Sequence, residues 1–119
     1  GPWLTAEENF NQYFANAATV TDPTAAARLA RYGVAGTASE RQWEKFDDRF
    51  DLAKEPNEVN RFGWIVEIDP YDPRAVPRKR TALGRFKHEA AQPRITKDGR
   101  VAVYMGDDER FDYLYKFVS

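Results

Sequence analysis

The sequence has no cysteine, a single histidine and no long hydrophobic segment. Without cysteine, the chain itself has no disulfide, thiolate metal site or cysteine nucleophile. With one histidine, any imidazole-based mechanism would depend on His88 alone. No apolar run approaches the roughly 20 residues that a membrane-spanning helix needs. The net charge is -1, so the basic footprint of a nucleic-acid-binding protein is absent and no nucleic acid partner is expected.

The residues that are present describe a folded domain. The chain has 119 residues, of which 42% are hydrophobic and 14% are aromatic, a composition that favours a packed core over disorder. It begins Gly1-Pro2 and ends with Ser119 directly after an apolar run. We therefore expect a single fragment, residues 1–119, cut at both ends from a longer protein.

The first half predicts a strand followed by a helical insertion at about 22–50. Residues 3–8 have the pattern of a strand. Asp22 and Pro23 are the favoured N-cap and first residue of a helix, and Gly33 is well placed to end that helix. A second helix is predicted from Ser39, because Ser39 and Gln42 fit a capping box.

The second half, about 61–119, predicts an antiparallel β-meander. Residues 64–68 form a strand in which Trp64 is expected to be largely buried, and 81–86 form the returning strand. Asp98-Gly99 is a strong hairpin signal between 94–96 and 101–105, and 113–118 form the last strand. The predicted fold class is mainly β with a short helical insertion.

Acidic residues stand at the predicted strand ends in three places: Glu7-Glu8, Glu89 after His88, and the turn Asp107-Asp108-Glu109. Clustered carboxylates bind hard cations, because their oxygens replace the water shell of the ion. Without cysteine, any metal would be oxygen-ligated: calcium, magnesium, manganese or ferric iron rather than structural zinc. The competing interpretation of each group is a solvated surface.

A basic run, Arg78-Lys79-Arg80 with Arg85 and Lys87, is the second candidate feature. It is interpreted either as a phosphate-binding edge or as charges that protect an edge strand. Phosphate loops, nucleophile elbows and nucleophile–His–Asp sets are all missing from the sequence.

Four stretches together resemble the PhoX-type bacterial alkaline phosphatases. Residues 5–14 resemble the family stretch T-x-E-E-N-F-N-x-Y-F, and 61–70 resemble its next strand. Residues 80–89 resemble K-R-T-A-L-G-R-F-K-H-E, and 104–110 match Y-x-G-D-D-E-R. The stretches occur in family order along nearly the whole chain, so the resemblance is far more specific than any single motif.

The resemblance implies a fold, an activity and a location. It implies a large β-propeller, of which this chain is about one blade, and hydrolysis of phosphate monoesters with calcium and iron in the periplasm, after export by a twin-arginine signal. The metal-ligand candidates it implies are Glu7 or Glu8, Glu89 and, more weakly, Asp107 and Asp108. Arg80 and Arg85 are candidates for substrate phosphate.

Two points qualify what the resemblance implies. Family members often have cysteine where this chain has Ala6, and the family uses a cysteine metal ligand. That ligand therefore lies outside the chain, or the site is altered. A chain of this length is too short for a whole propeller, so we expect the isolated chain to be inactive. The alternative function is a non-catalytic, calcium-stabilised binding module.

Overall fold

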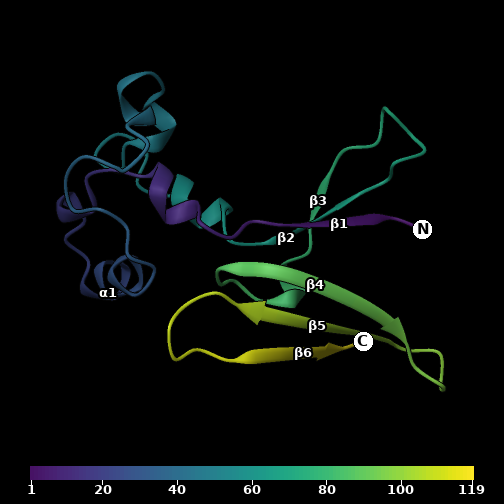
Figure 1. Cartoon of the computed structure of the whole chain (residues 1–119). Helices are drawn as coiled ribbons and strands as arrows, with labels where there is room; N and C mark the ends of the chain where they lie inside the picture. Colours follow the sequence, from purple (N-terminus) through teal and green to yellow (C-terminus); the bar gives the residue numbers. More distant parts are fainter. The chain divides into compact units, whose positions relative to one another are not determined.

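The computed structural model describes residues 1–119 and divides them into two compact units (Figure 1). The sheet unit comprises Gly1–Glu8 and Gly63–Ser119, and the insertion unit comprises Asn9–Phe62. The strands and the α-helix are β1 (Trp3–Ala6), α1 (Pro23–Arg31), β2 (Ile65–Ile68), β3 (Arg78–Lys79), β4 (His88–Ile95), β5 (Val101–Asp107) and β6 (Leu114–Val118). The predicted fold class, mainly β with a short helical insertion, is confirmed.

The sheet unit contains two three-stranded antiparallel sheets, in the orders β1-β2-β3 and β4-β5-β6. The sequence predicted one sheet. β1 packs against β4, and the core draws residues from both sheets. The residues most deeply buried in it are Ile65, Leu83, Phe86, Val103 and Met105. Trp64 is only partly buried, less than predicted.

The hairpin at Asp98-Gly99 joins β4 to β5 as predicted, with longer strands than the sequence indicated. Gly99 has φ +83°, a left-handed conformation that glycine adopts without a steric cost. In β5, Val103 and Met105 belong to the core, while the intervening Tyr104 is exposed. The period of two thus places Val103 and Met105 on the core face of the sheet.

The predicted returning strand at 81–86 is wrong. The strand is the shorter β3, and 81–83 form a 3₁₀ turn. The 3₁₀ turn places Leu83 in the core, and the chain then bends at Gly84, which has φ +85°. The amide of Phe86 donates to the carbonyl of Gly63 at 3.2 Å. Core burial and the bend at Gly84 therefore override the strand pattern.

In the insertion unit, α1 begins and ends as predicted. The Asp22 carboxylate accepts a hydrogen bond from the amide of Ala25 at 2.7 Å, and Pro23 is the first helical residue. Gly33 follows the helix with φ +69°. Leu29 on α1 is buried in the core of the insertion unit. The other buried residues of this core are Phe10, Phe14, Val34, Leu52 and Val59.

The predicted second helix from Ser39 is wrong. The capping interaction does form, because the Ser39 hydroxyl accepts from the amide of Gln42 at 2.8 Å. However, Gln42 has φ +56° and Asp47 is extended, and these conformations interrupt an α-helix. The segment forms two 3₁₀ turns instead, Trp43–Lys45 and Asp48–Phe50.

Candidate functional site

The candidate acidic residues come to one end of the sheet unit. β1 ends just before Glu7 and Glu8, β4 begins next to Glu89, and β5 ends at Asp107. Figure 1 shows these three strand ends at the same side of the unit. We call the strand-end region the residues Glu7–Glu8, Gly84–Glu89 and Asp107–Glu109. It contains six of the seven residues that the sequence singled out as ligands of metal or phosphate.

Glu89 occupies an irregularity in β4. His88 pairs with Asp107 and Ala90 pairs with Gly106, so the register shifts between them and Glu89 is the extra residue. Such a β-bulge leaves one residue outside the ladder and redirects its side chain, and bulges are frequent beside active sites. Glu89 is exposed, so its carboxylate is accessible to a ligand that approaches this end of the sheet.

Lys87 makes two contacts that hold the turn after β5. The Lys87 ammonium bonds to the Glu109 carboxylate at 2.6 Å, and the amide of Asp108 donates to the Lys87 carbonyl at 3.0 Å. The hydrogen bond from Lys87 lowers the pKa of Glu109. Asp107 accepts from the amide of Glu109 at 3.2 Å, whereas Asp108 is exposed. Within this turn, Glu109 is structural and Asp108 is the accessible carboxylate.

Glu7 and Glu8 differ in what they contact. One Glu7 oxygen accepts from the amide of Trp64 at 3.0 Å, and the other bonds to the Lys79 ammonium at 2.8 Å. The Glu7 side chain is 21% exposed, so it ties β1 to β2 and β3 from a mostly buried position. Glu8 is partly buried in the segment that follows β1. The geometry therefore gives Glu7 a structural role.

His88 is fully buried, with none of its surface exposed. Its ring stacks on Phe86 at 3.6 Å between centroids, and its Nε2 lies 2.9 Å from the Gly84 carbonyl. Because a carbonyl only accepts, Nε2 carries the proton, and the buried Nδ1 has no hydrogen-bond partner. Burial lowers the pKa of His88, opposed by the Gly84 carbonyl and the Glu7 charge.

The two candidate arginines differ in position. Arg85 lies in the strand-end region and is partly buried. Arg80 bonds to Glu67 at 2.6 Å, which lowers the pKa of Glu67 and raises that of Arg80. Arg80 also lines an apolar cavity that includes Ile95, at the opposite end of β4. The structure thus groups Arg85, but not Arg80, with the acidic residues.

These residues do not make a complete cage for calcium or iron. The chain brings together no group of three or more His, Asp or Glu side chains placed to hold a metal ion. Both oxygens of Glu7 already have partners, and a calcium ion takes six to eight oxygen ligands. A metal bound in the strand-end region would therefore need ligands from outside these residues.

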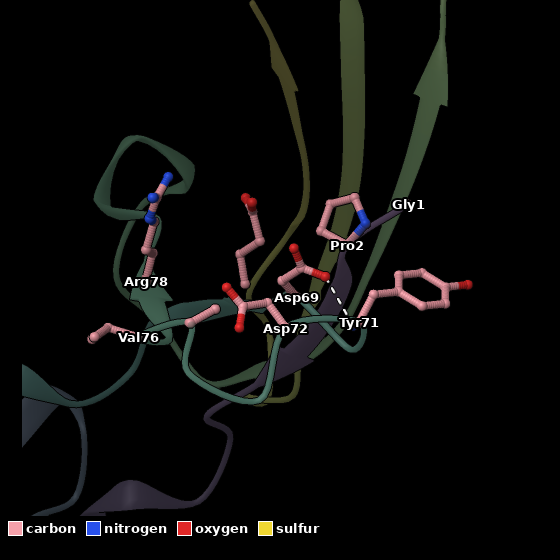
Figure 2. Close-up of a pocket in the computed structure, with 9 residues that line it drawn as sticks. Gly1, Pro2, Asp69, Tyr71, Asp72, Val76 and Arg78 are labelled. Carbon is pink, nitrogen blue, oxygen red and sulfur yellow. Dashed lines mark hydrogen bonds between the residues drawn. The ribbon is translucent and has the colours of Figure 1, made fainter.

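A cavity of about 740 Å³ lies at the loop between β2 and β3, away from the candidate residues (Figure 2). Figure 2 shows Asp69 and Asp72 between the outward-pointing side chains of Tyr71 and Val76. Asp69 accepts from the amide of Tyr71, and Asp72 from the amide of Arg74, both at 2.9 Å. These carboxylates shape the loop itself.

Sequence reasoning missed the partners of the candidate residues. Lys79 and Lys87 were assigned to a basic run, but each neutralises one glutamate, Glu7 and Glu109 respectively. The sequence favoured a surface or hydrogen-bonded residue at His88 over a ligand, and His88 is hydrogen-bonded to Gly84 but buried. The usable signal for His88 was its position at the start of a strand, two residues after Phe86.

By its fold, the chain is a mainly β fragment with a helical insertion. Such a fragment fits one part of a β-propeller. The family model described as "Alkaline phosphatase PhoX" matches residues 1–119. The chain belongs to this family. A search of curated proteins finds no match. No helix here has the length and apolar character to cross a membrane.

A solved structure is similar to the whole chain. It is described as "Pseudomonas fluorescens PhoX in complex with vanadate, a transition state analogue" and is 57% identical, with a TM-score of 0.88. The match covers 100% of this chain and 20% of that chain. This chain therefore spans about a fifth of the length of the structure it matches.

Proposed function

We propose that this chain is one part of a larger propeller enzyme, a metal-dependent phosphatase that hydrolyses phosphate monoesters. The observation that carries the proposal is the match to Pseudomonas fluorescens PhoX over the full chain at 57% identity. That protein binds vanadate as a transition state analogue. A site that binds such an analogue is built for the charge and geometry of phosphoryl transfer.

The strand-end region is the part of the chain that we assign to the site. Glu89 and Asp108 are exposed there and accessible to ligands. Of the two neighbouring glutamates, we assign the ligand role to Glu8, because Glu7 has a structural role in the sheet unit, where it contacts Trp64 and Lys79. Arg85 is the cation that we assign to substrate phosphate, because it lies in the strand-end region beside the acidic residues, whereas Arg80 lies outside that region.

We further propose calcium and iron as the metals, a small phosphate monoester as the substrate and the periplasm as the location. The remaining ligands would come from the rest of the longer protein, because the residues of this chain do not complete a cage. The isolated chain is then inactive. The resemblance of residues 5–14, 80–89 and 104–110 to the family motifs supports this assignment.

A chimera tests the proposal. This chain replaces the matching fifth of Pseudomonas fluorescens PhoX, and turnover of p-nitrophenyl phosphate is measured with calcium and ferric iron supplied. We expect the chimera to be active and the 119-residue chain alone to be inactive. A folded, metal-loaded chimera without activity would contradict the proposal, and so would turnover by the isolated chain.

Calcium titration of the isolated chain separates the enzyme from the alternative, a calcium-stabilised binding module. Two or three carboxylates leave most of the ion's shell to water, so we expect a dissociation constant of about 1 mM or weaker. A micromolar site would mean that the cage is local to this chain. That result would favour the binding module.

A further inference from the structure

We propose that His88 is a positioning residue, whose Nε2–H bond to the Gly84 carbonyl holds the bend before β4 and so sets the direction of Glu89. This inference rests on the proposed function only where it concerns turnover. The structural part, that one hydrogen bond fixes the bend, concerns the chain alone.

The first observation is that the imidazole is used as a donor. His88 is fully buried, and its Nδ1 has no partner. Leaving a buried polar atom unpaired destabilises the folded state, because its hydrogen bonds to water are lost and not replaced. A phenylalanine would fill the same space and stack on Phe86 without that cost. The group that an apolar ring lacks is the Nε2–H, which lies 2.9 Å from the Gly84 carbonyl.

The second observation is that this bond closes a tight bend that begins at a glycine. Gly84 has φ +85°, a backbone conformation that residues other than glycine rarely adopt. The bond spans from Gly84 to His88, and a backbone bond from the His88 amide to the Phe86 carbonyl, at 2.9 Å, lies within the same bend. The amide of Gly84 also donates to the Thr81 carbonyl, and the amide of Phe86 to the Gly63 carbonyl. The bond from His88 is the side-chain interaction that joins the two ends of this bend.

The third observation is that the bend leads directly to the bulge. Glu89 follows His88 and is the residue left out of the ladder. His88 pairs with Asp107, and the Lys87 carbonyl accepts from the amide of Asp108. A bend released at Gly84 would therefore change the direction of Glu89 and loosen the turn that carries Asp108.

Two substitutions separate the hydrogen-bond donor of His88 from its ring, because each one removes one of these and keeps the other. His88→Phe keeps the ring and the stack on Phe86 but has no N–H. His88→Gln loses the ring, but its amide nitrogen reaches about as far as Nε2. A positioning role predicts that His88→Gln keeps the bend and His88→Phe does not, whereas a packing role predicts the reverse. His88→Asn is polar but too short to reach the Gly84 carbonyl, so it should lose the bond as His88→Phe does, and it provides the test if His88→Phe fails to fold.

The structural readout is amide hydrogen exchange of the 119-residue chain. In His88→Phe we expect exchange of the Asp108 amide to rise by about tenfold or more, and in His88→Gln by less than about threefold. The control is the Thr96 amide, which bonds to the Arg100 carbonyl in the distant hairpin and should be unchanged. An equal rise at both amides would show general destabilisation and overturn the inference.

The functional readout is the chimera with Pseudomonas fluorescens PhoX. We expect kcat to fall about 10- to 100-fold in His88→Phe and His88→Asn and to stay within about threefold in His88→Gln. Equal losses of kcat in His88→Phe and His88→Gln, or a greater loss in His88→Gln, would overturn the inference. An inactive parent chimera would count against the proposed function, and the exchange experiment would still decide the role of His88.

Discussion

The two units of the chain use charged residues in different ways. In the insertion unit, Arg49 pairs with Glu58 and Lys54 with Asp48, and Asp51 accepts from Asn16. In the sheet unit, Glu89 and Asp108 are exposed at strand ends. All seven residues singled out by the sequence lie in the sheet unit. The comparison teaches that acidic residues indicate a site through their contacts and positions rather than their number.

The units also differ in what stabilises them. The sheet unit has backbone ladders in two sheets. The insertion unit has one α-helix and several 3₁₀ turns, so its stability depends on packed aromatic rings. Phe14 contacts Phe50 and Phe62 at 5.6 and 5.3 Å between centroids, and Tyr13 stacks on Trp43 at 4.6 Å.

The largest expected effect is on the core of the insertion unit. Phe14 has 0% of its surface exposed, so Phe14→Ala should lower the free energy of unfolding by about 3–5 kcal/mol. Phe46 is 88% exposed, and Phe46→Ala should change it by less than about 0.5 kcal/mol. Urea unfolding measures both. Similar losses in the two variants would show that the aromatic cluster is not the core.

An intermediate effect separates Glu7 from Glu8 in the sheet unit. Glu7→Gln removes the charge that pairs with Lys79 at 2.8 Å and should lower the free energy of unfolding by about 1 kcal/mol. Glu8→Gln should lower the turnover of the chimera and leave its free energy of unfolding nearly unchanged. Unfolding curves and kcat/KM of both variants provide the test. If Glu7→Gln lost activity without losing stability, the assignment of the two residues would be reversed.

The smallest expected effect is a difference in acid sensitivity. Hydrogen bonds from Asn16 to Asp51 and from Arg80 to Glu67 lower the pKa of each carboxyl. The unfolded chain therefore takes up these protons first, and stability is lost as pH falls below 4.5 for Glu67 and below 3.8 for Asp51. The free energy of unfolding, measured at a series of acidic pH values, should depend less on pH in Glu67→Gln and in Asp51→Asn than in the parent. The difference should begin at a higher pH in Glu67→Gln than in Asp51→Asn. Acid limbs that are unchanged from the parent in both Glu67→Gln and Asp51→Asn would contradict these linkages.

Local signals predicted the fold where a few neighbouring residues decide the conformation. Asp22-Pro23 starts α1, and Asp98-Gly99 forms the hairpin. The helix expected from Ser39 failed because Glu44, rather than Gln42, bonds back to the Ser39 amide and hydroxyl. The strand expected at 81–86 failed because burial of Leu83 requires a turn.

The candidate site could be predicted only in part, for a similar reason. The sequence indicated which acidic residues stand at strand ends, but it could not indicate which of them were already paired. Lys79 lies 72 residues from Glu7, and Lys87 lies 22 residues from Glu109. The bulge at Glu89 depends on the register of β4 against β5, which no local pattern specifies.

The most direct test of the account compares two glutamates, one from each unit, in the chimera with Pseudomonas fluorescens PhoX. Glu89→Gln keeps the shape of the side chain and removes its charge, and Glu40→Gln makes the same change at an exposed residue of the insertion unit. We predict that Glu89→Gln lowers kcat/KM by about 100-fold and reduces metal content while the chimera stays folded. Glu40→Gln should match the parent chimera in all three. Parent values of kcat/KM and metal content in Glu89→Gln would contradict the account.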